Sequence, residues 1–367
     1  TAPSYDSNAC AQIGKVGIGD IDISDDRKSL YAVNLGQKRV DQIDIASKTV
    51  VNSYAVPSTG CVAVGDSIRP WALKVRGSAI YVGAVCETSL KAFVFQLVGG
   101  AFVAIDLDST SANTYLDLSY AREVVYSVSG CDPTAGLTAS QWHTWSASWP
   151  SYYCFNPFNA SPPQYYIWYP QPILSDIEID NDDSLILGFM DRMGMQGGIN
   201  NWSPTSGDTR SFTTMSGGDT RRVCSTSTGY VPEGASAACP QTTSATNPAA
   251  REFYTGDIWL QTPQPQYHSE VTIGALAMLQ GSKNVVVSAF DPIEGDPNYD
   301  AGGVRWLNNT TGSYDRALEI YRAADSSSDG AFGKSIGLGD IELLCNPEPL
   351  QIGNRGWNDL NSDGVQD

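Results

Sequence analysis

The sequence lacks the residues that most metal centres and many active sites require. Its 367 residues include only two histidines, His143 and His268, and no two cysteines have the C-x-x-C spacing, which excludes the usual zinc and iron–sulfur arrangements. No G-x-S-x-G, H-E-x-x-H, phosphate-loop or dinucleotide-binding motif occurs, so nothing indicates the chemistries that these motifs serve. Paired carboxylates leave no strong motif, and catalysis is therefore not excluded. A protein that is not an enzyme is nevertheless the better expectation.

Basic residues and long apolar runs are also scarce. Lysine and arginine total 22 against 40 aspartate and glutamate residues, which gives a formal net charge of −18. Phosphate groups are bound by clustered basic side chains, so this balance argues against nucleic acid and anionic membrane surfaces as partners and favours cations. No run of about 20 apolar residues is present, and we expect no membrane insertion.

Glycine, proline and aromatic residues are plentiful, whereas charged residues make up only 17% of the chain. There are 35 glycines, 20 prolines, 18 tyrosines and 9 tryptophans. Aromatic residues favour strands, while glycine and proline favour the turns that connect them. The composition therefore predicts an all-β fold.

The eight cysteines are an even number, as expected for a set of disulfide bonds. Six of them form pairs that are close in the sequence, and the other two lie near the ends of the chain. We predict disulfides between Cys61 and Cys86, Cys131 and Cys154, Cys224 and Cys239, and Cys10 and Cys345, with other pairings open. Disulfides persist in oxidising compartments, so the sequence predicts an extracellular or cell-surface location. A start at Thr1 agrees with removal of an export signal.

An internal repeat is the strongest signal of architecture. The segment GIGDIDISDDRKSLYAVNL, residues 17–35, returns in weakened form further along the chain. The weaker copies are residues 69–85, 114–130, 173–189 and 272–290, and a half copy is residues 335–345. Each full copy alternates apolar and polar residues, passes through a short polar turn and continues as a second strand, which is the pattern of a β-hairpin.

The spacing of the copies suits one four-stranded sheet for each repeat. Such sheets bury both faces by stacking radially, so we predict a β-propeller of five to seven blades with disulfide-linked insertions over residues 1–349. The half copy predicts that a strand at 337–344 pairs with the N-terminal segment, and that the Cys10–Cys345 disulfide locks this closure. The alternative is one or two immunoglobulin-like sandwiches.

Acidic residues recur at fixed positions of the repeat. Asp20, Asp176 and Asp340 share one position. Two residues later the repeat carries Asp22, Asp117, Glu178 and Glu342. On innermost strands these groups would line the central channel and bind a cation or, with one pKa raised, act as acid and base. The alternative is that they only cap and solvate the strand ends.

The segment QWHTWSASWPSYYCFNPF is the most aromatic part of the chain. We take its residues Trp142, Trp145, Trp149, Tyr152 and Tyr153 as candidate interaction residues. Aromatic surfaces bind partner proteins and also stack on sugar rings, although these residues would equally pack on their own sheet. Loops on a rigid scaffold often carry recognition, so the insertions 131–169 and 190–262 are the predicted contact surfaces.

The final residues, IGNRGWNDLNSDGVQD, resemble the first strand and calcium loop of the B-type repeat domains of serine-aspartate-repeat bacterial surface proteins. By position, the resemblance implies structural calcium bound by Asp359, Asn361, Asp363 and Asp367 and by the carbonyl of Val365. We take residues 350–367 as a linker and the truncated start of such a domain. The rest of the chain resembles, more loosely, the propeller-like ectodomains that precede such modules.

These observations lead to one functional hypothesis and one rival. The hypothesis is a secreted bacterial surface protein that works by protein–protein contact, as an adhesin-like head or as the subunit of an extracellular filament or sheath. Its partners would be other subunits or cell-surface proteins. The rival is a propeller that binds or hydrolyses carbohydrate through aromatic platforms and channel carboxylates. Carboxyl groups about 5 to 10 Å apart in an open cleft would favour a hydrolase, whereas buried or dispersed ones favour the structural hypothesis.

Overall fold

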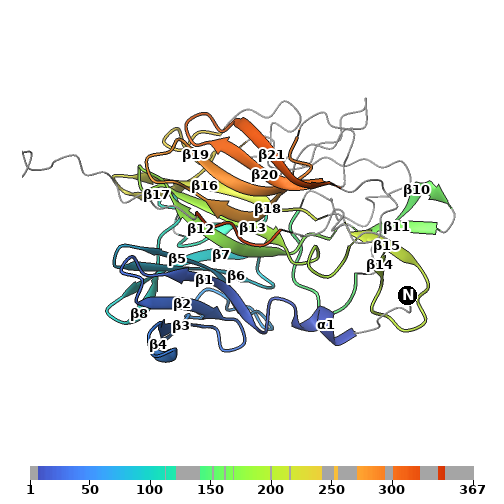
Figure 1. The fold of residues 1–367 in the computed structure, drawn as a ribbon, viewed down its shortest axis with the longest axis horizontal. Helices are drawn as coiled ribbons and strands as arrows, with labels where there is room; N and C mark the ends of the chain where they lie inside the picture. Colours follow the sequence, from blue (N-terminus) through green and yellow to red (C-terminus); the bar gives the residue numbers. More distant parts are fainter. Residues whose placement is uncertain are drawn as a thin grey trace, which may run out of the picture.

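The computed structural model describes twelve stretches of the chain. They are residues 7–111, 113–120, 141–150, 153–160, 163–167, 169–198, 201–214, 216–241, 252–254, 271–293, 301–322 and 338–343. Regular structure in these stretches is almost entirely strand, with one short helix, α1 (Ser7–Gln12). The prediction of an all-β fold is confirmed (Figure 1).

Four sheets of four or more strands follow the same antiparallel up-and-down order. The first contains β1 (Ile18–Ile23), β2 (Ser29–Asn34), β3 (Arg39–Asp44) and β4 (Thr49–Ala55). The second contains β5 (Ile68–Arg76), β6 (Ala79–Cys86), β7 (Lys91–Val98) and β8 (Ala101–Ala104), and the short β9 (Leu116–Asp117) pairs with β7. The third contains β12 (Pro172–Ile179), β13 (Leu185–Asp191), β16 (Asp219–Thr226) and β17 (Gly229–Pro232). The fourth contains β18 (Val271–Ala277), β19 (Asn284–Phe290), β20 (Ala301–Asn308) and β21 (Tyr314–Arg322).

Each of these sheets begins with a hairpin that the repeat predicts. The pairs β1–β2, β5–β6, β12–β13 and β18–β19 coincide with the copies at 17–35, 69–85, 173–189 and 272–290. The hairpin turns each hold one residue with a positive φ angle: Arg27, Gly77, Asp183 and Gly281. Turns of this kind reverse the chain sharply. The copy at 114–130 is represented only by β9, because residues 121–130 lie outside the described part.

The four sheets stack in chain order through their first strands. β1 contacts β5, β5 contacts β12, and β12 contacts β18, and the sheets are layered from blue to orange in Figure 1. Apolar cores fill the spaces between them, with Val33 and Phe93 in the first and Leu174 and Phe189 in the second. The sheets approach so closely that a Cβ on Gly188 would lie 2.2 Å from the carbonyl oxygen of Gly274.

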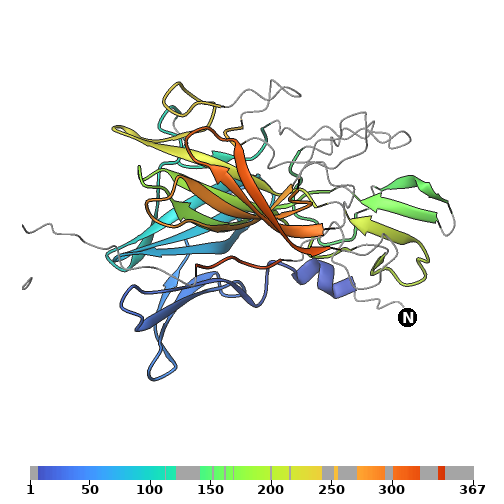
Figure 2. The same cartoon turned by 45° about the horizontal axis from the view of Figure 1, so that its top comes forward.

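A fifth sheet has a different topology. Its strands are β10 (Cys154–Ala160), β11 (Pro163–Ile167), β15 (Ser211–Thr214) and β14 (Asn201–Trp202), in that order, and β11 and β15 run parallel. This sheet comes from the two predicted insertions and lies beside the stack in both views (Figures 1 and 2). It is therefore an addition to the stack and not one of the repeated sheets.

The C-terminal half copy differs from its prediction. A strand was expected at 337–344, but residues 338–343 belong to no sheet and have no strand partner in the described part of the chain. The four described repeat sheets have the layered order expected of propeller blades. The total of five to seven blades and the closure of the ring stay predictions.

Candidate functional site

The acidic pair of the repeat points from one sheet to the next. On β1, Asp20 Oδ2 accepts the backbone N–H of Leu73 at 2.7 Å, and Asp22 Oδ2 accepts that of Val75 at 2.6 Å. Leu73 and Val75 alternate along β5, the first strand of the second sheet. An edge strand presents every second N–H group outward without a ladder partner. The two carboxylates therefore satisfy donors that the second sheet leaves open.

The same contact recurs two sheets further along the chain. Asp176 Oδ2 on β12 accepts the N–H of Leu276 on β18 at 2.6 Å, and Glu178 Oε1 accepts that of Met278 at 3.2 Å. We call Asp20, Asp22, Asp176 and Glu178 the clamp carboxylates. They join the first sheet to the second and the third sheet to the fourth.

The second oxygen of three clamp carboxylates is also engaged. Asp20, Asp22 and Asp176 each accept the N–H of the following residue through Oδ1, at 2.7, 2.6 and 2.7 Å. Asp20 is 8% exposed and Asp176 is 5% exposed. Buried carboxylates with both oxygens hydrogen-bonded to backbone are held in place by the two sheets that they join.

One lysine balances part of this charge. Lys74 Nζ lies 2.9 Å from Glu178 Oε1, and its charge also interacts with Asp176 and Asp22, so its pKa is raised above the ordinary value although burial acts in the opposite direction. Burial raises the pKa of all four clamp carboxylates. For Asp20 and Asp176, the charge of Asp340 raises the pKa further.

The structure thus brings together most of the carboxylates that share a position in the repeat. Asp20, Asp176 and Asp340 influence one another electrostatically, and Glu342 interacts with Lys74. Asp117 does not join them, because it lies exposed on β9 beside the edge of the second sheet.

The described residues do not arrange these carboxylates as a metal centre. Among those residues, the one group of three with potential ligand atoms close enough for an ion is Cys61, Asp66 and Cys86. Its two cysteines are bonded to each other in a disulfide. The geometry of the clamp carboxylates fits the joining of sheets better than catalysis or cation binding.

The candidate interaction residues at the start of the aromatic segment pack inward. Trp142 is 3% exposed, and its ring centre lies 6.2 Å from that of Phe189. The indole N–H of Trp145 donates to the carbonyl of Pro172 at 2.7 Å. These two tryptophans anchor the segment to the third sheet.

The remaining aromatic candidates adjoin the fifth sheet. The rings of Trp149 and Tyr153 lie 5.7 and 5.4 Å from that of Phe212 on β15, and the Arg210 guanidinium lies 4.4 Å from the centre of the Tyr153 ring. Tyr152 lies outside the described residues. The rings pack on their own sheet, and an interaction role for this segment stays a prediction.

Arg192, which sequence reasoning missed, connects the N-terminal helix to the third sheet. Its side chain is fully buried. Nε donates to the carbonyl of Ile13 at 2.8 Å, and Nη1 donates to the carbonyl of Ser146 at 2.9 Å and to Gln171 Oε1 at 2.7 Å. Nη2 donates to the carbonyl of Cys10 in α1. No motif reveals this arginine, because its partners are mostly backbone oxygens far away in the sequence.

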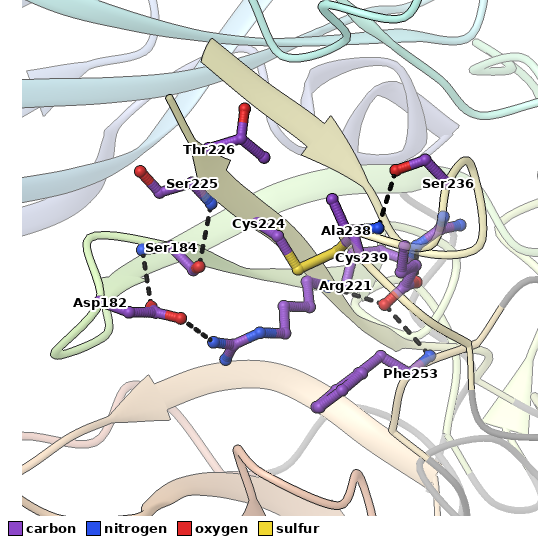
Figure 3. Close-up of a disulfide and its surroundings, with 12 residues drawn as sticks. Asp182, Ser184, Arg221, Cys224, Ser225, Thr226, Ser236, Ala238, Cys239 and Phe253 are labelled. Atoms are coloured by element: carbon purple, nitrogen blue, oxygen red, sulfur yellow. Dashed lines mark hydrogen bonds and ion pairs between the residues drawn. A yellow bond between two sulfur atoms is a disulfide. The ribbon is translucent and has the colours of Figure 1, made fainter. Parts of the chain in front are cut away.

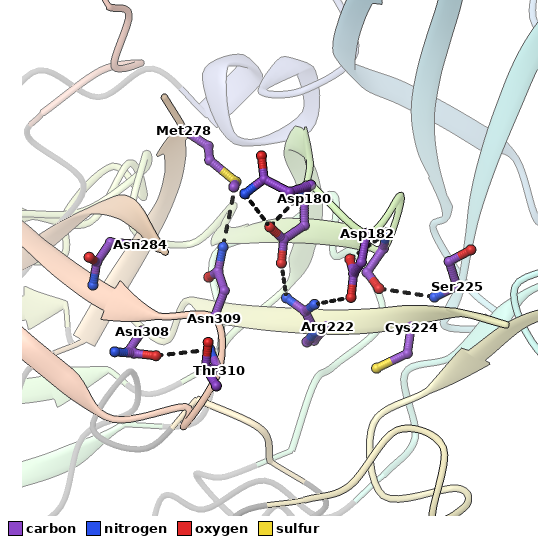
Figure 4. Close-up of polar contacts among 12 residues, drawn as sticks. Asp180, Asp182, Arg222, Cys224, Ser225, Met278, Asn284, Asn308, Asn309 and Thr310 are labelled. Carbon is purple, nitrogen blue, oxygen red and sulfur yellow. Dashed lines mark hydrogen bonds and ion pairs between the residues drawn. The ribbon is translucent and has the colours of Figure 1, made fainter. Parts of the chain in front are cut away.

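A second buried arginine holds the acidic turn that follows β12. Arg222 Nη1 lies 2.7 Å from Asp180 Oδ2, and Nη2 lies 3.0 Å from Asp182 Oδ2 (Figure 4). These carboxylates are therefore neutralised within the protein.

Two of the four predicted disulfides are confirmed. Cys61 pairs with Cys86, and Cys224 pairs with Cys239 (Figure 3). The other two predicted pairs include Cys131 and Cys345, which lie outside the described residues. The implied calcium ligands Asp359, Asn361, Asp363, Val365 and Asp367 also lie outside them. In the described stretches, no helix has both the length and the apolar character needed to cross a membrane.

Comparison with known proteins finds distant relatives. No protein-family model matches the chain. Colossin-A of Dictyostelium discoideum is 23% identical over 374 residues, which cover 97% of this chain and 3% of the relative. Colossin-B of the same organism is 24% identical and matches 100% of this chain and 9% of the relative, and colossin-D is 21% identical and matches 93% and 32%. The chain thus spans at most about a third of the length of these relatives.

Similar solved structures have low scores. The hydrazine synthase of Kuenenia stuttgartiensis has a TM-score of 0.33 and 10% identity, over 82% of this chain and 48% of that chain. The β-propeller domain of Cps50 from Myceliophteria thermophila has a TM-score of 0.30 and 8% identity, over 83% and 74%. The description of the fold therefore rests on the sheet order given above.

Proposed function

We propose that this chain is an extracellular structural or interaction protein that works by protein–protein contact. In this proposal it serves as an adhesin-like head or as the subunit of an extracellular filament or sheath. The relatives named above come from Dictyostelium discoideum, so the proposal does not depend on the bacterial origin that the terminal resemblance implies.

The observation that carries this proposal is an apolar row on the first sheet. Ile23 pairs with Leu30, Leu30 pairs with Ile43, and Ile43 pairs with Val50, so one apolar residue stands opposite another across all four strands. Side chains of directly opposed residues lie on the same face of a sheet. We call these four residues the apolar row.

The apolar row faces away from the second sheet. Tyr31 and Val33, which alternate with Leu30 along β2, belong to the core shared with the second sheet. Ile23 at one end of the row is 44% exposed, and Val50 at the other end is 53% exposed. Leu30 and Ile43, between the two ends, are half-buried. An apolar row that is partly open to water is typical of a surface that packs against another protein.

Two further observations support the proposal. The clamp carboxylates are buried and engaged with backbone N–H groups, as the structural hypothesis expects and a hydrolase does not. The two disulfides favour an oxidising compartment such as the cell exterior.

Sedimentation velocity over a range of protein concentrations tests the subunit version. We expect concentration-dependent association that Val50→Asp weakens, because the new charge would be buried at the contact. Val103→Asp is a matched control, since Val103 lies on the outermost strand of the second sheet and is equally 53% exposed. A chain that stays monomeric at every concentration would contradict the filament.

The same experiment in the presence and absence of calcium addresses the proposed structural calcium. Binding by residues 359–367 would need carboxylates in their ionised form. Calcium titration of the chain, with Asp363→Asn as the variant, should show weak binding that the variant abolishes. Equal binding by both proteins would count against the assignment of these ligands.

A further inference from the structure

A cavity of about 350 Å³ opens between the second and third sheets. Its walls come from the loop that follows β8 together with β9, and from β16 and β17. Its lining includes Asp108, Tyr115, Asp117, Tyr120, Arg221 and Glu233. Pockets for small molecules typically begin at about this size. The lining includes none of the clamp carboxylates and none of the candidate aromatic residues.

The base of the cavity is a buried ion pair. Arg221 is 2% exposed and Glu233 is 0% exposed, and the Arg221 Nε pairs with a carboxylate oxygen of Glu233. The guanidinium carbon of Arg221 lies 3.8 Å from the centre of the Tyr120 ring, and Figure 3 shows Arg221 near the Cys224–Cys239 disulfide. Burial raises the pKa of Glu233 to about 7, against the lowering effect of Arg221.

Arg221 offers one further donor. Its Nη1 is buried and has no hydrogen-bond partner in the described part of the chain. A buried donor without an acceptor is destabilising by about 1 to 3 kcal/mol, so such donors normally meet an oxygen. Because Arg221 lines the cavity, a ligand oxygen at the base would satisfy it.

The mouth of the cavity offers acceptors. Asp117 Oδ1 accepts the N–H of Ser119 at 2.9 Å and its hydroxyl at 2.7 Å, and Asp108 Oδ1 accepts the N–H of Thr110 at 3.1 Å. The other carboxylate oxygen of each aspartate accepts no hydrogen bond from a described residue. These two oxygens are open to a donor on a ligand.

Neither a simple anion nor a simple cation matches the whole lining. An anion would meet Asp108, Asp117 and Glu233, and a cation offers no acceptor to the Nη1 group of Arg221. A hydroxyl group both donates and accepts hydrogen bonds, so a neutral ligand with several hydroxyls matches the carboxylates at the mouth and the arginine at the base. We propose that this cavity binds a neutral saccharide unit. The proposal goes beyond the contact function, and neither depends on the other.

Isothermal titration of the whole chain with glucose, galactose, mannose and N-acetylglucosamine tests this site. We expect at least one of them to bind, and we expect Asp117→Asn to weaken that binding about tenfold or more, because a hydrogen bond to a charged acceptor is lost. Asp117 is exposed, so the variant should fold, and an unchanged thermal transition would confirm this.

The matched control is Asp44→Asn. Asp44 Oδ1 likewise accepts a serine N–H, that of Ser47 at 2.6 Å, but it lies on the first sheet away from the cavity. Binding should be unchanged in this variant. Absence of binding by every sugar at high millimolar concentration, or equal weakening by both variants, would overturn the proposal. Preferential binding of acetate or glycine would also overturn it.

Discussion

Truncation of one clamp carboxylate gives the sharpest test of how the sheets are joined. In Asp176→Ala, the N–H groups of Ile177 and Leu276 lose their acceptors. Both residues are at most 1% exposed. A buried unsatisfied donor costs about 1 to 3 kcal/mol, so the two together would cost about 2 to 6 kcal/mol.

Part of this loss is offset by relief of repulsion. Asp176 is surrounded by Asp20, Asp340 and Glu178, and burial also disfavours its ionised form. Removing the charge therefore stabilises the folded state and offsets part of the lost hydrogen bonding. We expect a net decrease in the free energy of unfolding of about 1 to 4 kcal/mol, within the range of core truncations. Asp176→Asn keeps one acceptor oxygen and should lie between the wild type and the alanine variant.

Urea unfolding followed by tryptophan fluorescence measures the loss, and amide hydrogen exchange shows where it occurs. Exchange at Leu276 should accelerate in Asp176→Ala before global unfolding does, because the edge of β18 is opened. Asp44→Ala is the control, since its N–H partner, Ser47, is exposed and finds water instead. If Asp176→Ala is as mild as Asp44→Ala and Leu276 exchanges at the wild-type rate, the carboxylate does not join the sheets.

Three further predictions concern charge, the N-terminal helix and a disulfide. Burial raises the pKa of the clamp carboxylates, so the folded state binds their protons more tightly than the unfolded state does. The folding stability that this difference contributes is complete below about pH 4 and is lost as pH rises through the raised pKa values. The melting temperature should therefore be higher at about pH 5 than at pH 7.5, and a flat or opposite profile would contradict this. Arg192→Met should destabilise by about 2 kcal/mol or more and speed proteolysis near α1, since four oxygens lose a charged donor; unchanged cleavage would show that α1 is held by other contacts. Replacing Cys224 and Cys239 by serine opens a loop with a sequence separation of 15 and should cost about 3 kcal/mol in urea unfolding; an unchanged midpoint would argue against the bond.

The repeated hairpins could be predicted because their signal is local. Strand alternation and a polar turn lie within about 17 residues, and the register of Ile21, Leu73, Ile177 and Leu276 follows from alignment of the copies. Disulfides between cysteines close in the sequence could be predicted for the same reason. Cys61 with Cys86 and Cys224 with Cys239 needed no knowledge of the tertiary structure.

Interactions between distant parts of the chain could not be predicted in this way. The repeat marked Asp20 and Asp176 as a set, but nothing in the sequence indicates that their acceptor oxygens would meet the N–H groups of Leu73 and Leu276. The parallel pairing of β11 with β15 also joins segments far apart in the sequence. Arg192 is a further example, because backbone oxygens carry no sequence signature.

The aromatic segment shows a different limit. A cluster of tryptophan and tyrosine has the same composition whether it forms a binding platform or a core. The deciding quantity is exposure, and Trp142 is 3% exposed against Phe189. The apolar row shows the reverse case, since Ile23 and Val50 occupy ordinary strand positions and only their exposure makes them candidates for a contact surface.

Hydroxyl-radical footprinting at low and high protein concentration tests the proposed contact function most directly, because it reports the solvent accessibility of individual side chains. The proposal predicts that oxidation of Ile23 and Val50 falls as the protein associates, while Val103, which is as exposed as Val50, is oxidised at an unchanged rate. Oxidation of the apolar row that does not depend on concentration, or protection of Val103 in its place, would contradict the proposal.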